Sequence, residues 1–181
     1  MDKPVRGLSL IQIMVRVRSQ GTLACMSAEV LMFKPVFRSV PLEWKDAARA
    51  LPLVQLVDPR ETAQDWIKFV RSRARAGRGG VQAIEDGRGY LHALFAWEIE
   101  RRLVWRRTLR VSGVVLGGLP GRAVRDAVFV SIRELASGYE CESIMVEASD
   151  EAGGLGRDAL LASGFSPVAA AAFVRRLNGE Q

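Results

Sequence analysis

The chain has 181 residues, of which 49% are hydrophobic and 25% charged, a balance typical of one folded domain with a buried core. No apolar run approaches the roughly 20 residues that span a bilayer, so we expect neither a membrane-spanning helix nor a membrane partner. The formal net charge is +6, and a basic balance of this size predicts attraction to anions rather than a particular function.

Cysteine and histidine are scarce and scattered. Cys25, Cys141 and the single histidine, His92, are too few for a zinc site of the usual kind, so we predict no metal. Free thiols are typical of a reducing compartment, and we therefore expect a cytoplasmic protein. Residues 1–27 are expected to form a poorly ordered N-terminal extension, and residues 28–181 a single domain.

The first organised segments read as a strand followed by helices. The pattern predicts a strand at 30–37, short helical pieces within 41–57 and a helix at 58–77. Pro35 favours an edge position for the strand, because proline cannot donate to a sheet ladder. Asp58 is predicted as the N-cap of the helix.

The end of that helix is basic, with Lys68, Arg71, Arg73 and Arg75 in its last turns. Cations near a helix C-terminus interact favourably with the helix dipole. We interpret the cluster as a solvated face rather than a nucleic-acid interface, so nucleic acid is the less favoured partner. The sequence leaves a homodimer open.

Three strand patterns follow at 80–86, 90–100 and 108–118, with short connections between them. Strands joined in this way pair as antiparallel neighbours. Strict alternation along the second strand places His92 and Glu98 on one face of the sheet.

After these strands the pattern changes. It predicts a helix at 122–136, a strand at 141–148, a short helix at 154–165 and a last strand at 167–177. The whole order predicts a mixed α/β (α+β) fold, with a mixed, mostly antiparallel sheet and helices on its faces.

A glycine-rich bend, GGLPG at 117–121, separates the third strand of the meander from the helix that follows. It lacks the Lys-Ser or Lys-Thr pair of a Walker A loop and the glycine spacing of a dinucleotide fingerprint. Amides at a helix start have no intrahelical partners and favour anions, so the bend could wrap a pyrophosphate. The alternative is a helix start that needs glycine only for tight packing.

The element order and the bend together resemble the GNAT acetyltransferase superfamily. In that family the fourth strand runs into an Arg/Gln-x-x-Gly-x-Gly/Ala loop that opens a long helix. Here the stretch GLPGRA matches it through Gly121 and Ala123, with Gly118 in place of the leading Arg or Gln.

A second motif supports the resemblance. The stretch ALLASGFSPV at 159–168 is similar to the family's helix-Gly-Phe-strand signature, matched at Gly164 and Phe165. The likeness covers roughly residues 28–177. It implies a GNAT-like sheet that is splayed at its fourth and fifth strands.

By that resemblance, the chain takes acetyl-CoA as a co-substrate and holds it through backbone groups. The residues expected to contact the pantetheine arm are Val114, Val115 and Leu116. The amides expected to hold the pyrophosphate are those of Leu119, Gly121, Arg122 and Ala123.

Acyl transfer to an amine needs a neutral nucleophile and a proton for the leaving thiolate. Many family members supply the proton from a tyrosine, which Leu160 replaces here, and no carboxylate occurs between Glu100 and Asp126. Two substitutes are considered as catalytic residues. His92 could act as a base near neutral pH, although a lone histidine in a sheet is more often structural, and Asp150 lies in the polar loop after the fifth strand.

Two functions are compatible with these residues. One is an acyl-CoA-dependent N-acyltransferase that works mainly by proximity, with acetyl-CoA as donor and an amine as acceptor. The alternative is a non-catalytic GNAT-fold module that binds a protein, an acyl-CoA or a nucleic acid. Gly121 and Ala123 favour the enzyme, whereas Gly118, Pro120 and Leu160 favour the module. We expect the enzyme, and the sequence does not identify the acceptor amine.

Overall fold

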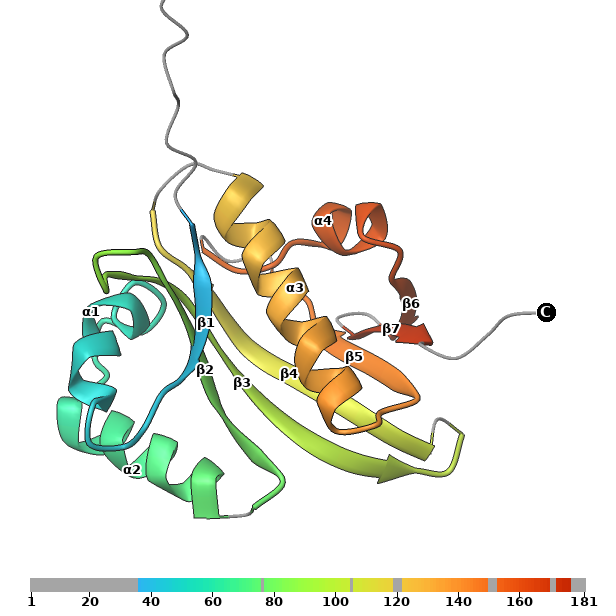
Figure 1. Cartoon of the computed structure of the whole chain (residues 1–181), viewed down its shortest axis with the longest axis horizontal. Coiled ribbons are helices and arrows are strands. Elements are labelled where there is room, and N and C mark those ends of the chain that lie inside the picture. The colour runs from blue at the N-terminus through green and yellow to red at the C-terminus, as the bar shows by residue number, and fades with distance from the viewer. Residues whose placement is uncertain are drawn as a thin grey trace, which may run out of the picture. The chain divides into compact units, whose positions relative to one another are not determined.

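The computed structural model describes residues 36–75, 77–104, 106–118, 122–149, 153–169 and 172–176. Within these residues a single sheet has the strand order β1-β2-β3-β4-β5-β7-β6 (Figure 1). The extension expected at 1–27 lies outside the described residues, so the boundary at residue 28 stays a prediction.

The strands are β1 Arg38–Pro41, β2 Gly79–Glu85, β3 Leu91–Arg102, β4 Arg106–Leu116, β5 Ser143–Glu147, β6 Ser166–Ala169 and β7 Ala172–Arg176. The helices are η1 Ala47–Ala50, α1 Leu51–Val54, α2 Ala63–Arg75, α3 Arg122–Gly138 and α4 Arg157–Ala162. Neighbouring strands are antiparallel except β4 and β5, which are parallel and are connected through α3. The mixed, mostly antiparallel sheet is therefore confirmed, and no described helix is long and apolar enough to cross a membrane.

Helices cover both faces of the sheet (Figure 1). The larger buried cluster lies on the side of α3 and includes Phe95, Val111 and Ile132. A smaller cluster lies on the side of η1, α1 and α2 and includes Leu94 and Trp66. Because the neighbours Leu94 and Phe95 belong to different clusters, β3 is buried on both faces, which explains its long apolar run.

The first described strand differs from the predicted one. The strand was expected at 30–37, but β1 occupies 38–41, residues 36–37 are not in a strand, and residues 30–35 lie outside the described part. β1 is an edge strand of the sheet, but Pro35 lies outside the described residues, so the edge position predicted from it stays a prediction.

The helix expected at 58–77 begins later than predicted. The Oγ1 atom of Thr62 accepts a hydrogen bond from the Asp65 N–H at 3.2 Å and donates one to the Asp65 carboxylate at 2.8 Å, which caps α2. Asp58 instead accepts a hydrogen bond from the Arg60 N–H at 3.0 Å and stabilises a turn. The N-cap prediction was wrong because an Asp-Pro pair suits a turn as well as a helix start.

The segment expected to be one strand at 167–177 contains two. β6 and β7 pair as an antiparallel hairpin, and β7 lies between β5 and β6 in the sheet. The alanine run that connects them carries none of the Gly, Pro, Asn or Asp residues that mark a turn, so the sequence showed no break.

Candidate functional site

The two parallel strands of the sheet part after a short ladder. β4 and β5 pair from Thr108 with Ser143 to Val111 with Val146, and no later rung joins their described residues. β4 continues to Leu116 beyond this ladder. We call the opening between residues 112–116 of β4 and the end of β5 the splay.

A bulge turns the backbone of β4 at the splay. Leu94 and Ala96 of β3 have one residue between them. Their partners in β4, Val115 and Ser112, have two residues between them, so β4 carries an extra residue. Gly113 lies within this bulge with φ +57°, a conformation that favours glycine. A Cβ atom on Gly113 would meet nothing within 4 Å, so backbone conformation rather than space requires glycine there. A lone glycine inside a strand was the available sequence signal.

The backbone groups of β4 alternate between β3 and the splay. The Gly117 N–H donates to a β3 carbonyl at 2.7 Å, whereas the Leu116 N–H donates to the Gly153 carbonyl at 2.5 Å. Consecutive N–H groups of a strand point to opposite edges, so Val114 faces the splay with Leu116, and Val115 faces β3. Of the expected pantetheine contacts, Val114 and Leu116 therefore present backbone groups at the splay.

Gly153, between β5 and α4 in the chain, lies against the end of β4. Gly153 has φ +97°, and a Cβ atom on it would lie 3.1 Å from the Leu116 carbonyl oxygen. This close approach requires glycine. A ligand that used the Leu116 N–H would have to replace the hydrogen bond to Gly153, so binding at Leu116 requires Gly153 to move.

The glycine bend is closely packed at its first residue. A Cβ atom on Gly117 would lie 2.9 Å from the His92 carbonyl oxygen and 3.0 Å from Cδ2 of Leu53. A Cβ atom on Gly118 would meet nothing within 4 Å. Tight packing therefore accounts for Gly117, while Gly118 leaves open space at the bend.

The first turn of α3 contains two of the expected phosphate contacts, Arg122 and Ala123, which are both exposed. Arg122 forms an ion pair with Asp126, at 3.6 Å, one turn further along the helix. Amides in this turn have no intrahelical partners and face the positive end of the helix dipole. Leu119 and Gly121 lie outside the described residues, and their roles stay predictions.

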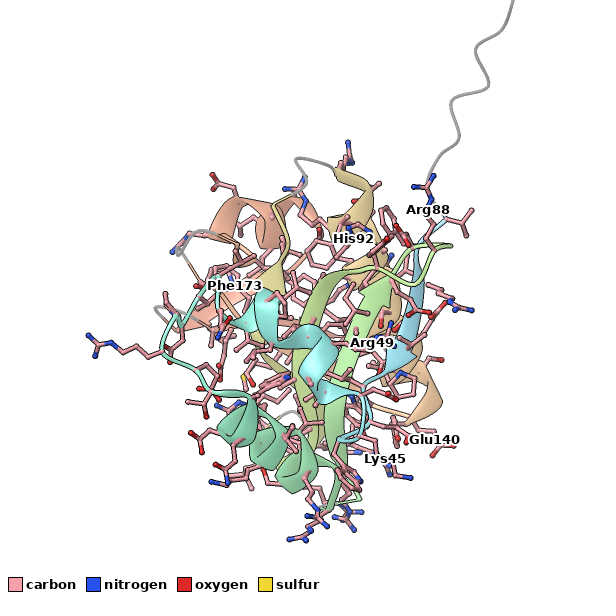
Figure 2. The ribbon with its side chains drawn as sticks, turned by 90° about the vertical axis from the view of Figure 1, so that its left-hand side faces the viewer. Lys45, Arg49, Arg88, His92, Glu140 and Phe173 are labelled. Carbon is pink, nitrogen blue, oxygen red and sulfur yellow. The ribbon has the colours of Figure 1, made fainter. Side chains whose placement is uncertain are left out.

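His92, the second residue of β3, is anchored to Asp86 in the turn between β2 and β3. Its Nε2 atom lies 3.0 Å from Oδ2 of Asp86, and the other oxygen of that carboxylate accepts the Arg88 and Tyr90 amides. The imidazole also packs edge-on against Phe37, with ring centroids 5.3 Å apart. The hydrogen bond from His92 holds the pKa of Asp86 below its usual value. Figure 2 shows His92 and Arg88 at the same end of the molecule, and the contacts favour a structural role.

The expectation that His92 and Glu98 share a face was wrong. The register between β2 and β3 shifts beside His92, which places this residue in a bulge. His92 contacts Phe37, which packs on the α3 side of the sheet, whereas Glu98 forms an ion pair with Arg73 of α2. A bulge adds one residue to a strand, so strict alternation fails beyond it.

Of the expected acid and base positions, Leu160 and His92 lie among the described residues and Asp150 does not. Leu160 of α4 is fully buried in the larger cluster, so the position of the family's tyrosine holds an apolar side chain that cannot donate a proton. Asp150 lies outside the described residues, so its assignment as a catalytic residue stays a prediction.

An ion-pair network that the sequence analysis did not find lies beside the splay. Arg110 of β4 donates to Glu147 at the end of β5 from Nε at 3.0 Å and from Nη2 at 2.5 Å. Its Nη1 atom contacts Glu98 and Glu100 of β3 at 3.3 Å and 3.1 Å. The hydrogen bond with Glu147, more than that with Glu100, holds the pKa of Arg110 above its usual value. The network joins three strands at the last rungs before the splay.

No protein-family model and no curated protein matches the sequence, but solved structures match the fold. An acetyltransferase of Trypanosoma brucei is 15% identical, with 81% of this chain and 100% of that chain covered and a TM-score of 0.59. A GNAT-family acetyltransferase of Streptococcus pneumoniae is 11% identical, with 79% and 100% covered and a TM-score of 0.56. The aminoglycoside N-acetyltransferase AAC(6')-Iy, solved in complex with CoA, is 10% identical, with 81% and 95% covered and a TM-score of 0.62. The chain therefore has the GNAT acetyltransferase fold.

Proposed function

We propose that the chain is an N-acyltransferase that moves the acetyl group of acetyl-CoA to an amine. The observation that carries this proposal is the splay, to which the bulge at Gly113 turns the backbone groups of Val114 and Leu116. The Val114 backbone at this strand edge is suited to an extended ligand such as a pantetheine arm, and the Leu116 N–H becomes available to the ligand when its hydrogen bond to Gly153 breaks. The shared fold supports the same ligand class, because one of the similar structures was solved with CoA.

The phosphates of the co-substrate are assigned to the start of α3. The N–H groups of Arg122 and Ala123 lie in the first turn, which contains no acidic residue. Unpartnered amides and the helix dipole together favour a phosphate at this end. The guanidinium of Arg122 adds a positive charge, although Asp126 partly neutralises it.

The chemical step needs few side chains. The amine nitrogen attacks the thioester carbonyl carbon, the C–S bond breaks, and the thiolate takes up the proton that the amine releases. We assign the Val114 N–H as the donor that stabilises the developing oxyanion. Leu160 cannot supply the proton, so either Asp150 or water transfers it, and much of the rate enhancement comes from proximity and orientation.

A non-catalytic module is the second candidate. The apolar core position of Leu160 and the hydrogen bond between Leu116 and Gly153 both favour it.

We also propose that the protein is cytoplasmic. The buried free thiol of Cys141 supports this location, because free thiols are typical of a reducing compartment.

An acceptor screen separates the two functions. The chain is incubated with acetyl-CoA and a panel of amines that includes N-terminal peptides, amino sugars and aminoglycosides, and release of the CoA thiol is followed. We expect at least one amine to raise thiol release above the rate without acceptor. CoA binding without thiol release for any amine class would favour the module.

A further inference from the structure

The hairpin between β3 and β4 ends in exposed apolar side chains. Leu103 is fully exposed and Val104 is 73% exposed. In the sequence RRLVWRR they lie between the arginine pairs 101–102 and 106–107, and Trp105 lies outside the described residues. Aliphatic side chains gain hydrophobic stabilisation only when something covers them, so this tip is a candidate contact surface.

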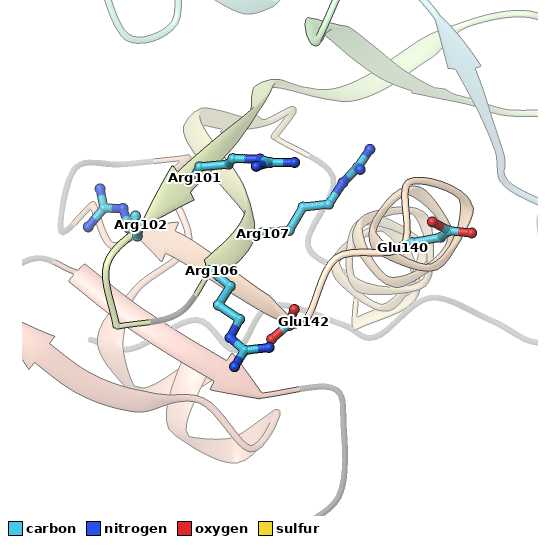
Figure 3. Close-up of a pocket in the computed structure, with 6 residues that line it drawn as sticks. All are labelled: Arg101, Arg102, Arg106, Arg107, Glu140 and Glu142. Carbon is cyan, nitrogen blue, oxygen red and sulfur yellow. The ribbon is translucent and has the colours of Figure 1, made fainter.

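The arginines beside the tip surround a cavity of about 410 Å³. Its lining residues are Arg101, Arg102, Arg106, Arg107, Glu140 and Glu142 (Figure 3). Arg102 is paired with Glu100, but no described carboxylate forms an ion pair with Arg101, Arg106 or Arg107. The buried Nε atom of Arg107 also lacks a hydrogen-bond partner among the described residues. These three arginines are therefore available to an external anion, although Glu140 and Glu142 in the same lining lower the net positive charge.

The tip is remote from the splay. β4 runs from Arg106, beside the tip, to Leu116, at the splay, and a strand of this length spans roughly 30 Å. Figure 2 likewise shows Glu140, which lines the arginine cavity, at the opposite end of the molecule from His92. A surface that covered the tip would leave the candidate acyl-CoA site open.

We propose that the tip docks on an anionic lipid surface. Leu103 and Val104 enter the headgroup region, and Arg101, Arg106 and Arg107 contact the lipid phosphates and carboxylates. A shallow apolar anchor and adjacent basic residues together provide the two signals that stable surface binding needs. The expectation of no membrane partner rested on the lack of an apolar span, and surface docking needs no such span.

Two other occupants would suit either the arginines or the exposed aliphatic side chains of the tip, but not both. Nucleic-acid phosphates would pair with the arginines, but they leave the two aliphatic side chains without an apolar environment. A second copy of the chain would cover the aliphatic side chains, but it would bring a second set of arginines to the same place. An anionic lipid surface provides both the apolar layer and the negative charge.

Vesicle sedimentation with the full chain tests the proposal. We expect binding to vesicles of phosphatidylcholine with phosphatidylserine, weak binding to phosphatidylcholine alone, and loss of binding as salt rises. The double variant L103S/V104S should lower the vesicle partition constant by at least about tenfold. The variant R101Q/R106Q should lower it by about fivefold for each arginine removed.

Matched variants elsewhere on the surface provide the controls. Leu56 and Val57 form the same dipeptide, 56% and 40% exposed, in the turn before α2, so L56S/V57S should bind vesicles like the wild type. K45Q/R88Q removes two exposed cations away from the tip and should have little effect. Unchanged thermal unfolding of L103S/V104S would show that the fold is retained.

Three results would overturn the proposal. The first is equal vesicle binding by the wild type and L103S/V104S, or no binding of either to phosphatidylserine vesicles. The second is tight binding of duplex DNA or RNA that L103S/V104S retains, which would assign the arginines to nucleic acid. The third is a dimer in sedimentation equilibrium that L103S/V104S dissociates, which would assign the tip to a second copy.

Discussion

Val111 of β4 and Val146 of β5 form the last rung of the parallel ladder, and both side chains are fully buried. Immediately before this rung, Arg110 joins β4 to Glu147 on the opposite face of the sheet. Immediately after it, the bulge at Gly113 redirects β4. Packing of the two buried valines therefore holds the strands together at the last rung. Beyond that rung, the backbone conformation of Gly113 redirects β4 at the place where the strands part.

The bulge should depend on glycine. Replacing Gly113 by alanine forces a Cβ atom into the left-handed region and should lower the free energy of unfolding by about 1–2 kcal/mol. Gly87→Ala is the matched control, because its Cβ atom also meets nothing within 4 Å and its φ lies outside the left-handed region. Urea unfolding of both variants measures the difference. Equal stability of the two variants would show that the bulge carries no conformational strain.

Of the two described glycines of the bend, Gly118 should tolerate a methyl group and Gly117 should not. Gly117→Ala places a Cβ atom against the His92 carbonyl and Leu53, so the backbone must shift, at a cost of about 1–3 kcal/mol. The same shift should weaken CoA binding, because it displaces the loop that leads to α3. In Gly118→Ala the added Cβ atom meets no atom within 4 Å, so this variant should lower stability and CoA affinity less than Gly117→Ala does. Thermal unfolding and CoA titration measure stability and CoA affinity in both variants. Equal losses in the two variants would contradict this prediction.

Acid should destabilise the ion-pair network. Burial opposes ionisation of Glu100, but hydrogen bonds from Arg102 and Arg110 outweigh it and lower its pKa from the ordinary 4.5. A carboxyl whose folded pKa is lowered stabilises the fold above its ordinary pKa, and this stabilisation is lost as pH falls through the folded pKa. Because these side chains are partly exposed, we expect a contribution of only about 1 kcal/mol near neutral pH.

The variant Arg110→Gln tests this pH dependence. It removes the cation that contacts Glu98, Glu100 and Glu147, so the stability lost on acidification should become smaller. Unfolding by urea is measured from about pH 7 to about pH 3 in both proteins. Identical pH profiles for wild type and variant would show that Arg110 does not control the ionisation of Glu100.

Two substitutions test the assignment of the base. Loss of a general base should lower the turnover by about 10²–10⁴-fold with little change in CoA affinity. We expect this from Asp150→Asn but not from His92→Gln, because Asp86 and Phe37 hold the His92 side chain at the start of β3. Wild-type rates in both variants would show that neither residue is the base, and proton transfer through water would be the remaining route.

Local sequence patterns were sufficient to predict the strands and the long helix at the centre of the fold. The antiparallel meander of β2, β3 and β4 and the long helix α3 follow from alternating apolar residues, short turns and a helical period. The glycine bend marked the boundary between strand and helix. These features depend on neighbours in sequence, so they can be predicted without knowledge of the tertiary structure.

The remaining features depend on pairing between distant residues. The bulge at His92 and the contact of Arg110 with Glu147 follow from the register of separate strands, which a single sequence does not specify. The sequence between β6 and β7 lacks the usual turn residues, so the break between the two strands follows from their pairing with each other and with β5. Sequence reasoning therefore placed the splay but missed the charged network beside it.

Titration calorimetry with CoA tests the central claim, that the splay and the glycine bend bind an acyl-CoA. We predict that the wild type binds one CoA per chain. Gly121→Glu should abolish this binding through bulk and like charge at the bend while thermal unfolding stays unchanged. Absence of wild-type binding at near-millimolar CoA, or equal affinity of the two proteins, would contradict the account and leave the glycines with a packing role alone.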